Sequence, residues 1–264
     1  MTETARTLET LELTREDGVA IVSINNPPMN VINLAMGDDL ITVCDELASD
    51  TSVRVVVFRS ANPGVFIAGA DISLLGQLNA DTLAEFQRVA GVMDRVAALP
   101  QPTIASLGGV TLGGGFELAL ACDFRFMGDG FGEIGLPEVR LGLLPGGGGT
   151  QRLPRIVGAA RATEMLIKGM RYTPQQAHEL GIVHKVVPAD ELDAEVAKYA
   201  RSLAAQAPLA VQAIKRLVRA SFEQPGESGL ALEKELFLEL AASGDAKEGI
   251  AAFFEGRKPA FSGS

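Results

Sequence analysis

At 264 residues with 47% hydrophobic side chains, the chain can bury a full core, which excludes an intrinsically disordered protein. Its formal net charge of −10 and its pI near 4.8 disfavour nucleic acid as the main partner. No apolar run reaches the ~18 to 20 residues needed to span a bilayer, and residues 1–13 contain no apolar stretch typical of a signal peptide. We therefore expect a cytoplasmic protein without a membrane partner.

The N-terminal half alternates strand and helix patterns. Apolar and β-branched runs predict strands at residues 8–13, 19–24, 53–58, 103–107 and 123–127. Helical periodicity predicts helices at residues 34–47, 81–99 and 116–122. Because strands alternate with helices, the sequence indicates an α/β core of parallel layers in which a strand–strand–helix rhythm recurs.

The pattern becomes largely helical from about residue 159. Helices are expected at residues 159–168 and 174–180, with Gly181 as the C-cap, followed by a last strand at 182–187. Four more helices are predicted at residues 191–205, 209–222, 229–242 and 245–254. Their Ala and Leu residues at helical spacing suit packing on another subunit, so we expect an oligomer; a plain helical layer over the sheet is the alternative.

Metal, thiolate and histidine chemistry are not expected. Cys44 and Cys122 lie in apolar helical patterns and are interpreted as small buried hydrophobes. His178 follows a polar helix start and His184 lies in a strand-like run, so both are expected at the surface or at a sheet edge. No spacing resembles a zinc or iron–sulfur site. Catalysis would then depend on carboxylates and backbone amides.

The stretch 113–117, Gly-Gly-Gly-Phe-Glu, carries the strongest chemical signal. It lies between a strand-like run and a helix-like run, where glycines let the backbone turn sharply and approach a ligand. The first amides of a helix lack intrahelical partners, and Gly114 and Glu117 share one helix face. The segment can therefore offer a backbone donor to a developing oxyanion, with a carboxylate beside it. A Glu that merely complements the helix dipole is the alternative.

A second segment of the same type is Phe66-Ile67-Ala68-Gly69-Ala70-Asp71. Asp71 suits the N-cap of a short helix that begins near Ile72, and Gly69 permits the turn that presents the Ala70 amide. Two backbone donors from separate strand-to-helix turns are what an oxyanion hole needs, because side-chain donors cost extra entropy to order.

A second carboxylate is expected from the glycine-rich segment 128–149. Pro137 stiffens the turn that carries Glu138, and loops with several glycines inside a domain are often functional. A solvated turn residue is the alternative for Glu138. If Glu138 and Glu117 share one buried site, joint ionisation is disfavoured, so one can hold a proton while the other acts as a base.

Other interpretations of the glycines fail on their details. Residues 146–149 do not form a phosphate loop, because Gln151 and Arg152 stand where Lys and Ser or Thr would be needed. No glycine run has dinucleotide-binding spacing in a strand-to-helix setting. The stretch 109–113 imitates a nucleophile elbow with Thr111 in place of Ser, but that mechanism needs a His base.

These motifs together resemble the crotonase (enoyl-CoA hydratase/isomerase) superfamily, from about Leu11 to the end of the chain. The resemblance is carried by residues 66–71, 113–118, 137–138, 145–153 and 254–261. It implies an α/β fold made of a spiral of ββα units over residues 1–200, followed by a helical trimerisation region over residues 201–264. It also implies a trimer or a dimer of trimers.

The resemblance further assigns roles to residues of this chain. The thioester carbonyl of an acyl-CoA would lie between the amides of Ala70 and Gly114. Glu138 would handle the proton at Cα, and Glu117 the water at Cβ. The coenzyme A portion would meet the backbone of Ala68, Gly69, Ala70, Asp71 and Ile72, while Lys258 would reach the phosphates bound by a neighbouring subunit. No separate cofactor or metal is implied, since coenzyme A is part of the substrate.

The presence of both glutamates favours an enoyl-CoA hydratase over its alternatives. A Δ3-Δ2 enoyl-CoA isomerase, in which one glutamate moves a proton, is the nearest alternative. A non-catalytic acyl-CoA-binding or scaffold subunit is the alternative of another class. The acyl chain length and the pathway do not follow from the sequence.

Overall fold

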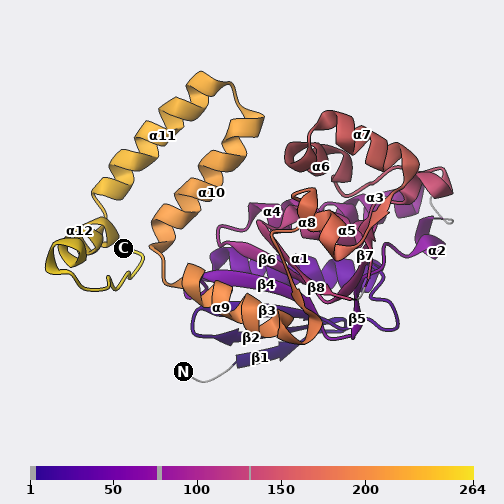
Figure 1. The fold of residues 1–264 in the computed structure, drawn as a ribbon, viewed down its shortest axis with the longest axis horizontal. Coiled ribbons are helices and arrows are strands. Elements are labelled where there is room, and N and C mark those ends of the chain that lie inside the picture. Colours follow the sequence, from indigo (N-terminus) through magenta and orange to yellow (C-terminus); the bar gives the residue numbers. More distant parts are fainter. Residues whose placement is uncertain (1–3, 76–78, 131) are drawn as a thin grey trace.

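The computed structural model describes residues 4–75, 79–130 and 132–264. Two sheets form its centre (Figure 1). The larger sheet has the strand order β1-β2-β3-β4-β6-β8-β11, and the smaller has the order β10-β9-β7-β5. The larger comprises β1 (Thr4–Thr7), β2 (Leu11–Glu16), β3 (Val19–Ile24), β4 (Val55–Ser60), β6 (Thr103–Leu107), β8 (Phe124–Asp129) and β11 (Lys185–Pro188). The smaller comprises β5 (Gly64–Ile67), β7 (Gly109–Leu112), β9 (Ile134–Gly135) and β10 (Arg171–Tyr172).

Consecutive strands alternate between the two sheets. β4 lies in the larger sheet and β5 in the smaller, and the pairs β6–β7 and β8–β9 repeat this step. The pair β6–β7 is followed by α5 (Gly114–Ala121), and β8–β9 by the 3₁₀-helix η1 (Glu138–Leu141). The predicted strand–strand–helix rhythm is therefore present, and it brings the ends of β5, β7 and β9 to one edge of the smaller sheet.

The layers are less uniformly parallel than the sequence predicted. Strands from β3 to β11 pair in parallel, but β1, β2 and β3 form an antiparallel meander at one end of the larger sheet. β10 likewise pairs antiparallel with β9. The alternation of strands with helices indicates parallel pairing only where a helix connects them, and the first three strands are joined by short turns.

Helices cover the sheets and extend beyond them. They are α1 (Leu34–Ser49), α2 (Ile72–Leu75), α3 (Ala80–Ala90), α4 (Val92–Ala98), α6 (Gly149–Val157), α7 (Ala159–Lys168), α8 (Pro174–Glu179), the 3₁₀-helix η2 (Ala189–Glu191), α9 (Leu192–Ala204), α10 (Pro208–Glu223), α11 (Gly226–Ala241) and α12 (Gly244–Glu255). The single helix predicted at residues 81–99 is two helices, because the chain turns at Gly91 between α3 and α4. No helix in the described residues is both long enough and apolar enough to cross a bilayer.

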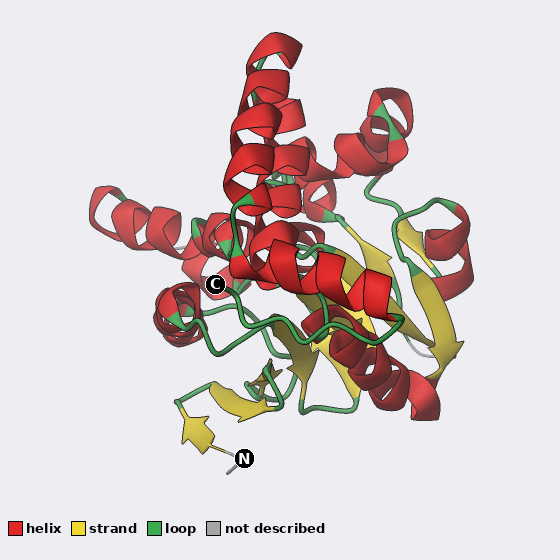
Figure 2. Ribbon diagram, turned by 90° about the vertical axis from the view of Figure 1, so that its left-hand side faces the viewer, coloured by secondary structure: helices red, strands yellow, loops and turns green. Residues whose placement is uncertain are grey.

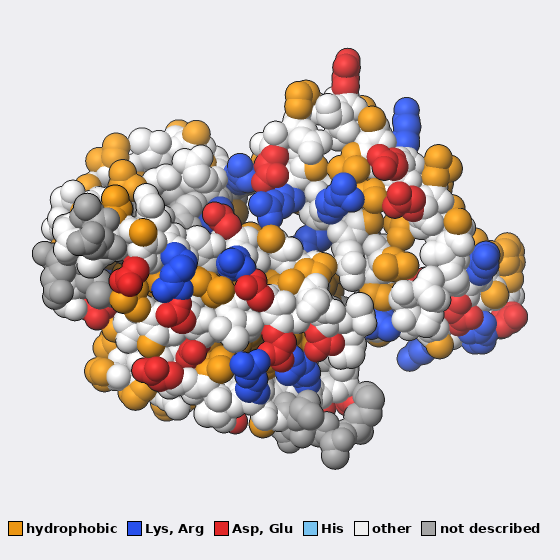
Figure 3. Space-filling model, turned by 180° about the vertical axis from the view of Figure 1, so that it is seen from behind, with side chains coloured by type: hydrophobic (Ala, Val, Ile, Leu, Met, Phe, Trp, Pro, Cys, Tyr) orange, Lys and Arg blue, Asp and Glu red, His pale blue; other side chains and the backbone are white. Residues whose placement is uncertain are grey.

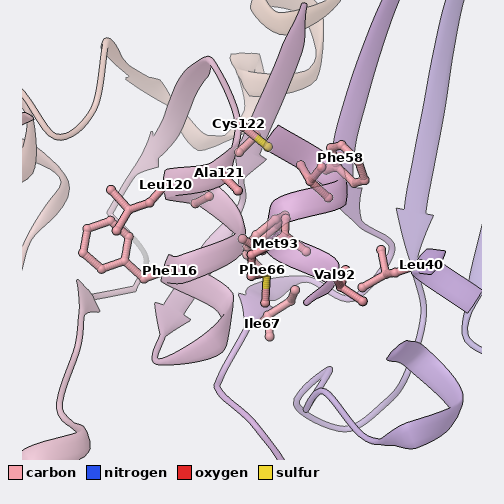
Figure 4. Packing of buried hydrophobic residues seen from close by; sticks show 14 of the residues in the cluster. Leu40, Phe58, Phe66, Ile67, Val92, Met93, Phe116, Leu120, Ala121 and Cys122 are labelled. Carbon is pink, nitrogen blue, oxygen red and sulfur yellow. The ribbon is translucent and has the colours of Figure 1, made fainter. Parts of the chain in front are cut away.

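The main core surrounds α5. Every residue of α5 after Gly114 is buried, which is expected of a helix that is apolar nearly all round. Figure 4 shows Phe116 and Leu120 of this helix together with Phe66, Ile67 and Met93 in the same apolar cluster. This packing fixes α5 as a rigid element, so its first turn is presented in one orientation. Both cysteines, as predicted, are buried and free.

The C-terminal helices divide into two sets. α9 packs on the larger sheet, where Leu192, Val196 and Ala200 join a second core cluster. α10, α11 and α12 extend away from the sheets (Figures 1 and 2). Hydrophobic side chains remain exposed on this extension (Figure 3), and Phe253 and Phe254 on α12 are 80% and 82% exposed. The predicted division at residues 200 and 201 falls within α9, and the assignment of residues 201–264 to oligomerisation stays a prediction.

The close approach of β5 and β7 gives a testable requirement for glycine. A Cβ added at Gly109 would lie 2.0 Å from the carbonyl carbon and oxygen of Gly64 on the paired strand, whereas one added at the neighbouring Gly108 would meet nothing within 4 Å. We expect Gly109→Ala to lower the free energy of unfolding by about 1 to 3 kcal/mol or more, because backbone must move apart. Gly108→Ala should change it by about 0.5 kcal/mol or less.

The measurement is urea unfolding followed by far-ultraviolet circular dichroism, since the chain has no Trp to report by fluorescence. Equal stability of the two variants would contradict this description of the smaller sheet.

Candidate active site

The first turn of α5 presents one of the two predicted backbone donors. Gly113 is the N-cap, with a φ of +54°, and its carbonyl accepts from the Glu117 amide at 2.9 Å. The Gly113 amide donates to Gly135 O at 3.0 Å, which fixes the turn to β9. Among the described residues the Gly114 amide has no hydrogen-bond acceptor, as expected for the first residue of a helix.

The second donor is the amide of Ala70. Ile32 forms a parallel β-bridge with Ala70. The Ile32 amide donates to Gly69 O at 2.9 Å, and the Ile32 carbonyl accepts from the Asp71 amide at 3.0 Å. In a parallel bridge of this kind the amide of Ala70 points to the opposite side, and no acceptor for it occurs within the described part of the chain. A Cβ added at Gly114 would lie 3.7 Å from the Ala70 nitrogen. The two donors are therefore neighbours.

Glu117 is buried and held by backbone amides. Its side chain is on the inner face of α5, the residue is 4% exposed, and Oε1 accepts from the amides of Gly147 at 2.7 Å and Gly149 at 2.8 Å. Burial raises the pKa of Glu117, and these two hydrogen bonds and the charge of Arg152 oppose that rise. Oε2 receives no hydrogen bond from the described residues, so this oxygen is available to a ligand.

Glu138 is at the start of η1, with Pro137 as the N-cap. Its Oε2 is buried and has no hydrogen-bond partner among the described residues. Burial, and to a smaller extent the negative charge of Glu117, raises the pKa of Glu138 to about 7. A Cβ added at Gly113 would lie 3.3 Å from Glu138 Oε1, so this carboxyl group faces the turn that presents the Gly114 amide. The Glu138 carboxyl thus lies beside the turn of the Gly114 amide and close enough to Glu117 to be affected by its charge.

The other predicted binding residues have different positions. Asp71 caps α2, since its Oδ1 accepts from the Ser73 amide at 2.9 Å, and Ile72 is 61% exposed beside it. The Ala68 amide is already engaged with Met29 O at 3.1 Å. Lys258 follows α12, which Figure 1 places at the opposite end of the molecule from α2. One chain therefore does not bring Lys258 to the segment of Ala68 to Ile72.

Sequence reasoning missed the donors that hold Glu117. Gly147 and Gly149 belong to the glycine run that was recognised as a loop, but nothing in its spacing indicated a partner 30 residues away. The signal that could have found them is the burial of Glu117 itself, because a buried carboxylate requires donors. A helix predicted to begin at the glycine run would have supplied amides without intrahelical partners as candidate donors.

The nucleophile-elbow interpretation of Thr111 fails in the structure. Thr111 is buried within β7, and its hydroxyl donates to Gly109 O at 2.9 Å. His184 Nδ1 accepts from the Arg125 amide, and His178 Nδ1 contacts Val183 O, so neither ring contacts Thr111 in the described structure. Both histidines are exposed, as predicted. Within the described ranges no three His, Cys, Asp or Glu side chains gather as metal ligands would.

Comparison with known proteins identifies the family of the chain. The sequence model described as "Enoyl-CoA hydratase/isomerase" matches residues 14–264. The chain belongs to this family. It is 41% identical to mouse enoyl-CoA hydratase domain-containing protein 2, over 93% of this chain and 85% of that protein. It is 39% identical to the 2,3-dehydroadipyl-CoA hydratase of Escherichia coli, over 96% and 98%.

Solved structures establish the fold class. The crystal structure of an enoyl-CoA hydratase from Geobacillus kaustophilus superposes with a TM-score of 0.95 over 100% of both chains, at 40% identity. An enoyl-CoA hydratase from Bacillus anthracis gives a TM-score of 0.90 at 33% identity, again over 100% of both chains. The predicted crotonase-like α/β fold is therefore confirmed.

The raised pKa of Glu138 predicts how stability depends on pH. The pKa of this carboxyl rises from an ordinary value of 4.5 to about 7 on folding. Between these values the folded chain holds a proton that the unfolded chain has lost, so the stability contribution is present at low pH and is lost as pH rises through 7. Glu138→Gln removes this titration. We expect the variant to gain stability relative to the wild type between about pH 5 and about pH 8.

Urea unfolding of both proteins across that range measures the difference. A difference that stays constant with pH would show that the Glu138 carboxyl has an ordinary pKa in the folded chain.

Proposed function

We propose that this protein is an enoyl-CoA hydratase, which adds water across a 2-enoyl-CoA to give a 3-hydroxyacyl-CoA. The observation that carries the proposal is that two carboxyl groups, Glu117 and Glu138, lie close to two neighbouring amides, those of Ala70 and Gly114, which have no acceptor among the described residues. Membership of the enoyl-CoA hydratase/isomerase family supports an acyl-CoA thioester as the substrate.

The amides of Ala70 and Gly114 would stabilise the charge that develops on the thioester oxygen. Addition of water at Cβ pushes electrons toward the carbonyl, which becomes enolate-like. Two donors set in place before the reaction need no reorganisation when this charge appears, and the loss of one such donor typically costs about 3 to 4 kcal/mol. Each donor comes from a segment fixed by packing or by a backbone bridge, so their spacing is set by the fold.

The two carboxyl groups would divide the proton transfers. Glu117 is fixed through Oε1, so its Oε2 can accept the proton of the attacking water as that water adds at Cβ. Glu138, with its pKa raised to about 7, can hold a proton at neutral pH and donate it to Cα. Each such transfer contributes about 10² to 10⁴ in rate. The different environments of the two groups therefore suit a base and an acid.

We also propose where coenzyme A binds and how the chain assembles. Coenzyme A would lie along the backbone of Ala68 to Ile72, and no separate cofactor would be needed. Contact with Lys258 would require a second copy of the chain, since one chain does not bring the two segments together. The exposed Phe253 and Phe254 support self-association, for which we propose a trimer or a dimer of trimers. A cytoplasmic location stays a prediction.

The variant Glu117→Gln tests the division of roles. Gln keeps an oxygen that can accept from Gly147 and Gly149, so the loop should stay in place, but the side chain can no longer act as a base. We expect hydration of crotonyl-CoA, followed by the loss of enoyl thioester absorbance, to fall by about 10² to 10⁴ in kcat.

The outcomes separate the three candidate functions. Wild-type hydration with a strong loss in Glu117→Gln is the expected result. Isomerisation of a 3-enoyl-CoA at undiminished rate in that variant would favour the isomerase. Binding of crotonyl-CoA with no change in absorbance by the wild type would favour a binding subunit.

The variant Gly114→Ala tests the oxyanion donors without removing a carboxylate. The new methyl would lie 3.7 Å from the Ala70 nitrogen and would crowd the space between the donors. Its contact with Ile32 Cδ1, at 3.0 Å, is with the end of a flexible side chain, so folding should persist. We expect kcat for crotonyl-CoA hydration to fall by about 10² to 10³.

Gly226→Ala is the matched control, because a Cβ there would meet nothing within 4 Å and the residue lies at the start of α11. Wild-type kcat in Gly114→Ala would contradict the assignment of this amide to the thioester oxygen.

A further inference from the structure

The loop before α6 is shaped around two side chains. A Cβ added at Gly147 would lie 2.9 Å from Glu117 Oε2, and one at Gly149 would lie 3.1 Å from Glu117 Oε1. A Cβ added at Gly148, whose φ is +98°, would lie 2.2 Å from Nη1 of Arg152. The Glu117 carboxylate therefore favours glycine at Gly147 and the positive φ favours it at Gly148, while at Gly149 an added Cβ would come closest to Leu136 Cδ1, at 2.7 Å, and Pro145 Cβ, at 2.9 Å.

Arg152 is held by contacts on both sides of this loop. From α6, its Nη1 donates to Gly147 O at 2.6 Å, while its Nη2 pairs with Asp94 on α4. The side chain of Arg152 is 16% exposed, whereas that of Asp94 is 78% exposed. The planar fork of Arg can make both contacts at once, which the single ammonium of Lys cannot do in the same geometry. The hydrogen bond to Gly147 O is therefore more shielded from solvent than the ion pair with Asp94.

The carbonyl that Arg152 binds lies between the two donors of Glu117. The Gly147 amide belongs to the preceding peptide group and the Gly149 amide to the following one, so fixing the peptide group between Gly147 and Gly148 constrains the orientation of both. Gly148 also accepts from the amides of Gln151 and Arg152 as the N-cap of α6. The guanidinium adds a further constraint on the peptide group between Gly147 and Gly148, where the glycine backbone itself imposes little steric restriction.

We infer that Arg152 is a positioning residue for Glu117: it locks the Gly147–Gly149 backbone so that both amides hold Oε1 and leave Oε2 directed to the reacting water. The effect of Arg152 on the rate of hydration rests on the proposed function, whereas its effect on the position and titration of the Glu117 carboxyl does not. The charge of Arg152 also opposes the rise in the pKa of Glu117 that burial causes. Two other charged groups face this place: Glu138 on η1, whose own pKa is raised in part by Glu117, and Asp94 on α4, which pairs with Arg152.

Three variants test this role through turnover of crotonyl-CoA. Arg152→Met keeps an apolar stem but removes the donors and the charge, and we expect kcat to fall about 10- to 100-fold with KM nearly unchanged. Arg152→Lys restores the charge, but on a single nitrogen that cannot reproduce the planar fork, and should recover part of kcat. Asp94→Asn removes only the charge of the exposed partner, so kcat should stay within about twofold of the wild type. Wild-type kcat in both Arg152 variants would overturn the inference.

A second readout distinguishes positioning from a general loss of stability. In Arg152→Met and Arg152→Lys, the pH dependence of kcat and the infrared titration of the Glu117 carboxyl are measured, with Glu117→Gln used to assign the infrared band. We expect the acidic limb of kcat and the Glu117 titration to move to higher pH in Arg152→Met, and by less in Arg152→Lys. An unchanged Glu117 titration in Arg152→Met would overturn the inference.

The infrared titration does not require turnover. A shifted titration in a chain whose wild type fails to hydrate crotonyl-CoA would retain the role of Arg152 toward Glu117 and refute the proposed function instead.

Discussion

The burial of the Glu117 carboxyl is the constraint on which the site depends. A carboxylate removed from water is costly unless donors satisfy it, and this fold supplies two backbone amides at 2.7 and 2.8 Å. Those amides lie in a glycine run: a Cβ added at Gly147 would lie 2.9 Å from Glu117 Oε2, and one added at Gly149 would lie 2.7 Å from Leu136 Cδ1 and 3.1 Å from Glu117 Oε1. The glycine-rich loop, the helix that begins after it and the position of Glu117 are thus consequences of one interaction. Glu138 differs, because its buried Oε2 has no hydrogen-bond partner in the described part of the chain.

α5 links the position of Glu117 to the position of the Gly114 amide, because both belong to this one buried helix. Its N-terminus presents the Gly114 amide, its middle carries Glu117, and its C-terminal carbonyls are held by the buried Arg125. The Arg125 guanidinium donates to Ala119 O at 3.1 Å and to Cys122 O at 2.7 Å, while its Nε donates to Ile182 O. A cation at the C-terminus of a helix complements the helix dipole, so this contact stabilises α5 at the end away from the site. A displacement of α5 would move the proposed oxyanion donor and the proposed base together.

Local sequence patterns predicted the parts of the site that are local. Gly113 to Glu117 and Gly69 to Asp71 are short segments in which glycine freedom, helix N-terminal amides and capping act over a few residues, and the structure places both as expected. The contacts from Gly147 and Gly149 to Glu117 could not be predicted in this way, because a backbone donor has no side-chain signature. β5 and β7 were missed since each is four residues long and begins with glycine. The break at Gly91 was missed because apolar periodicity continues across it.

In the proposed function, the amides of Ala70 and Gly114 both donate hydrogen bonds to the carbonyl oxygen of an acyl-CoA thioester. Infrared difference spectroscopy of a saturated acyl-CoA, isotopically labelled at its carbonyl carbon, reports this interaction without turnover. Two hydrogen bonds to the oxygen weaken the C=O bond, so the account predicts that the labelled band moves to lower frequency on binding. A bound thioester whose carbonyl band stays at or above its frequency in water would contradict it.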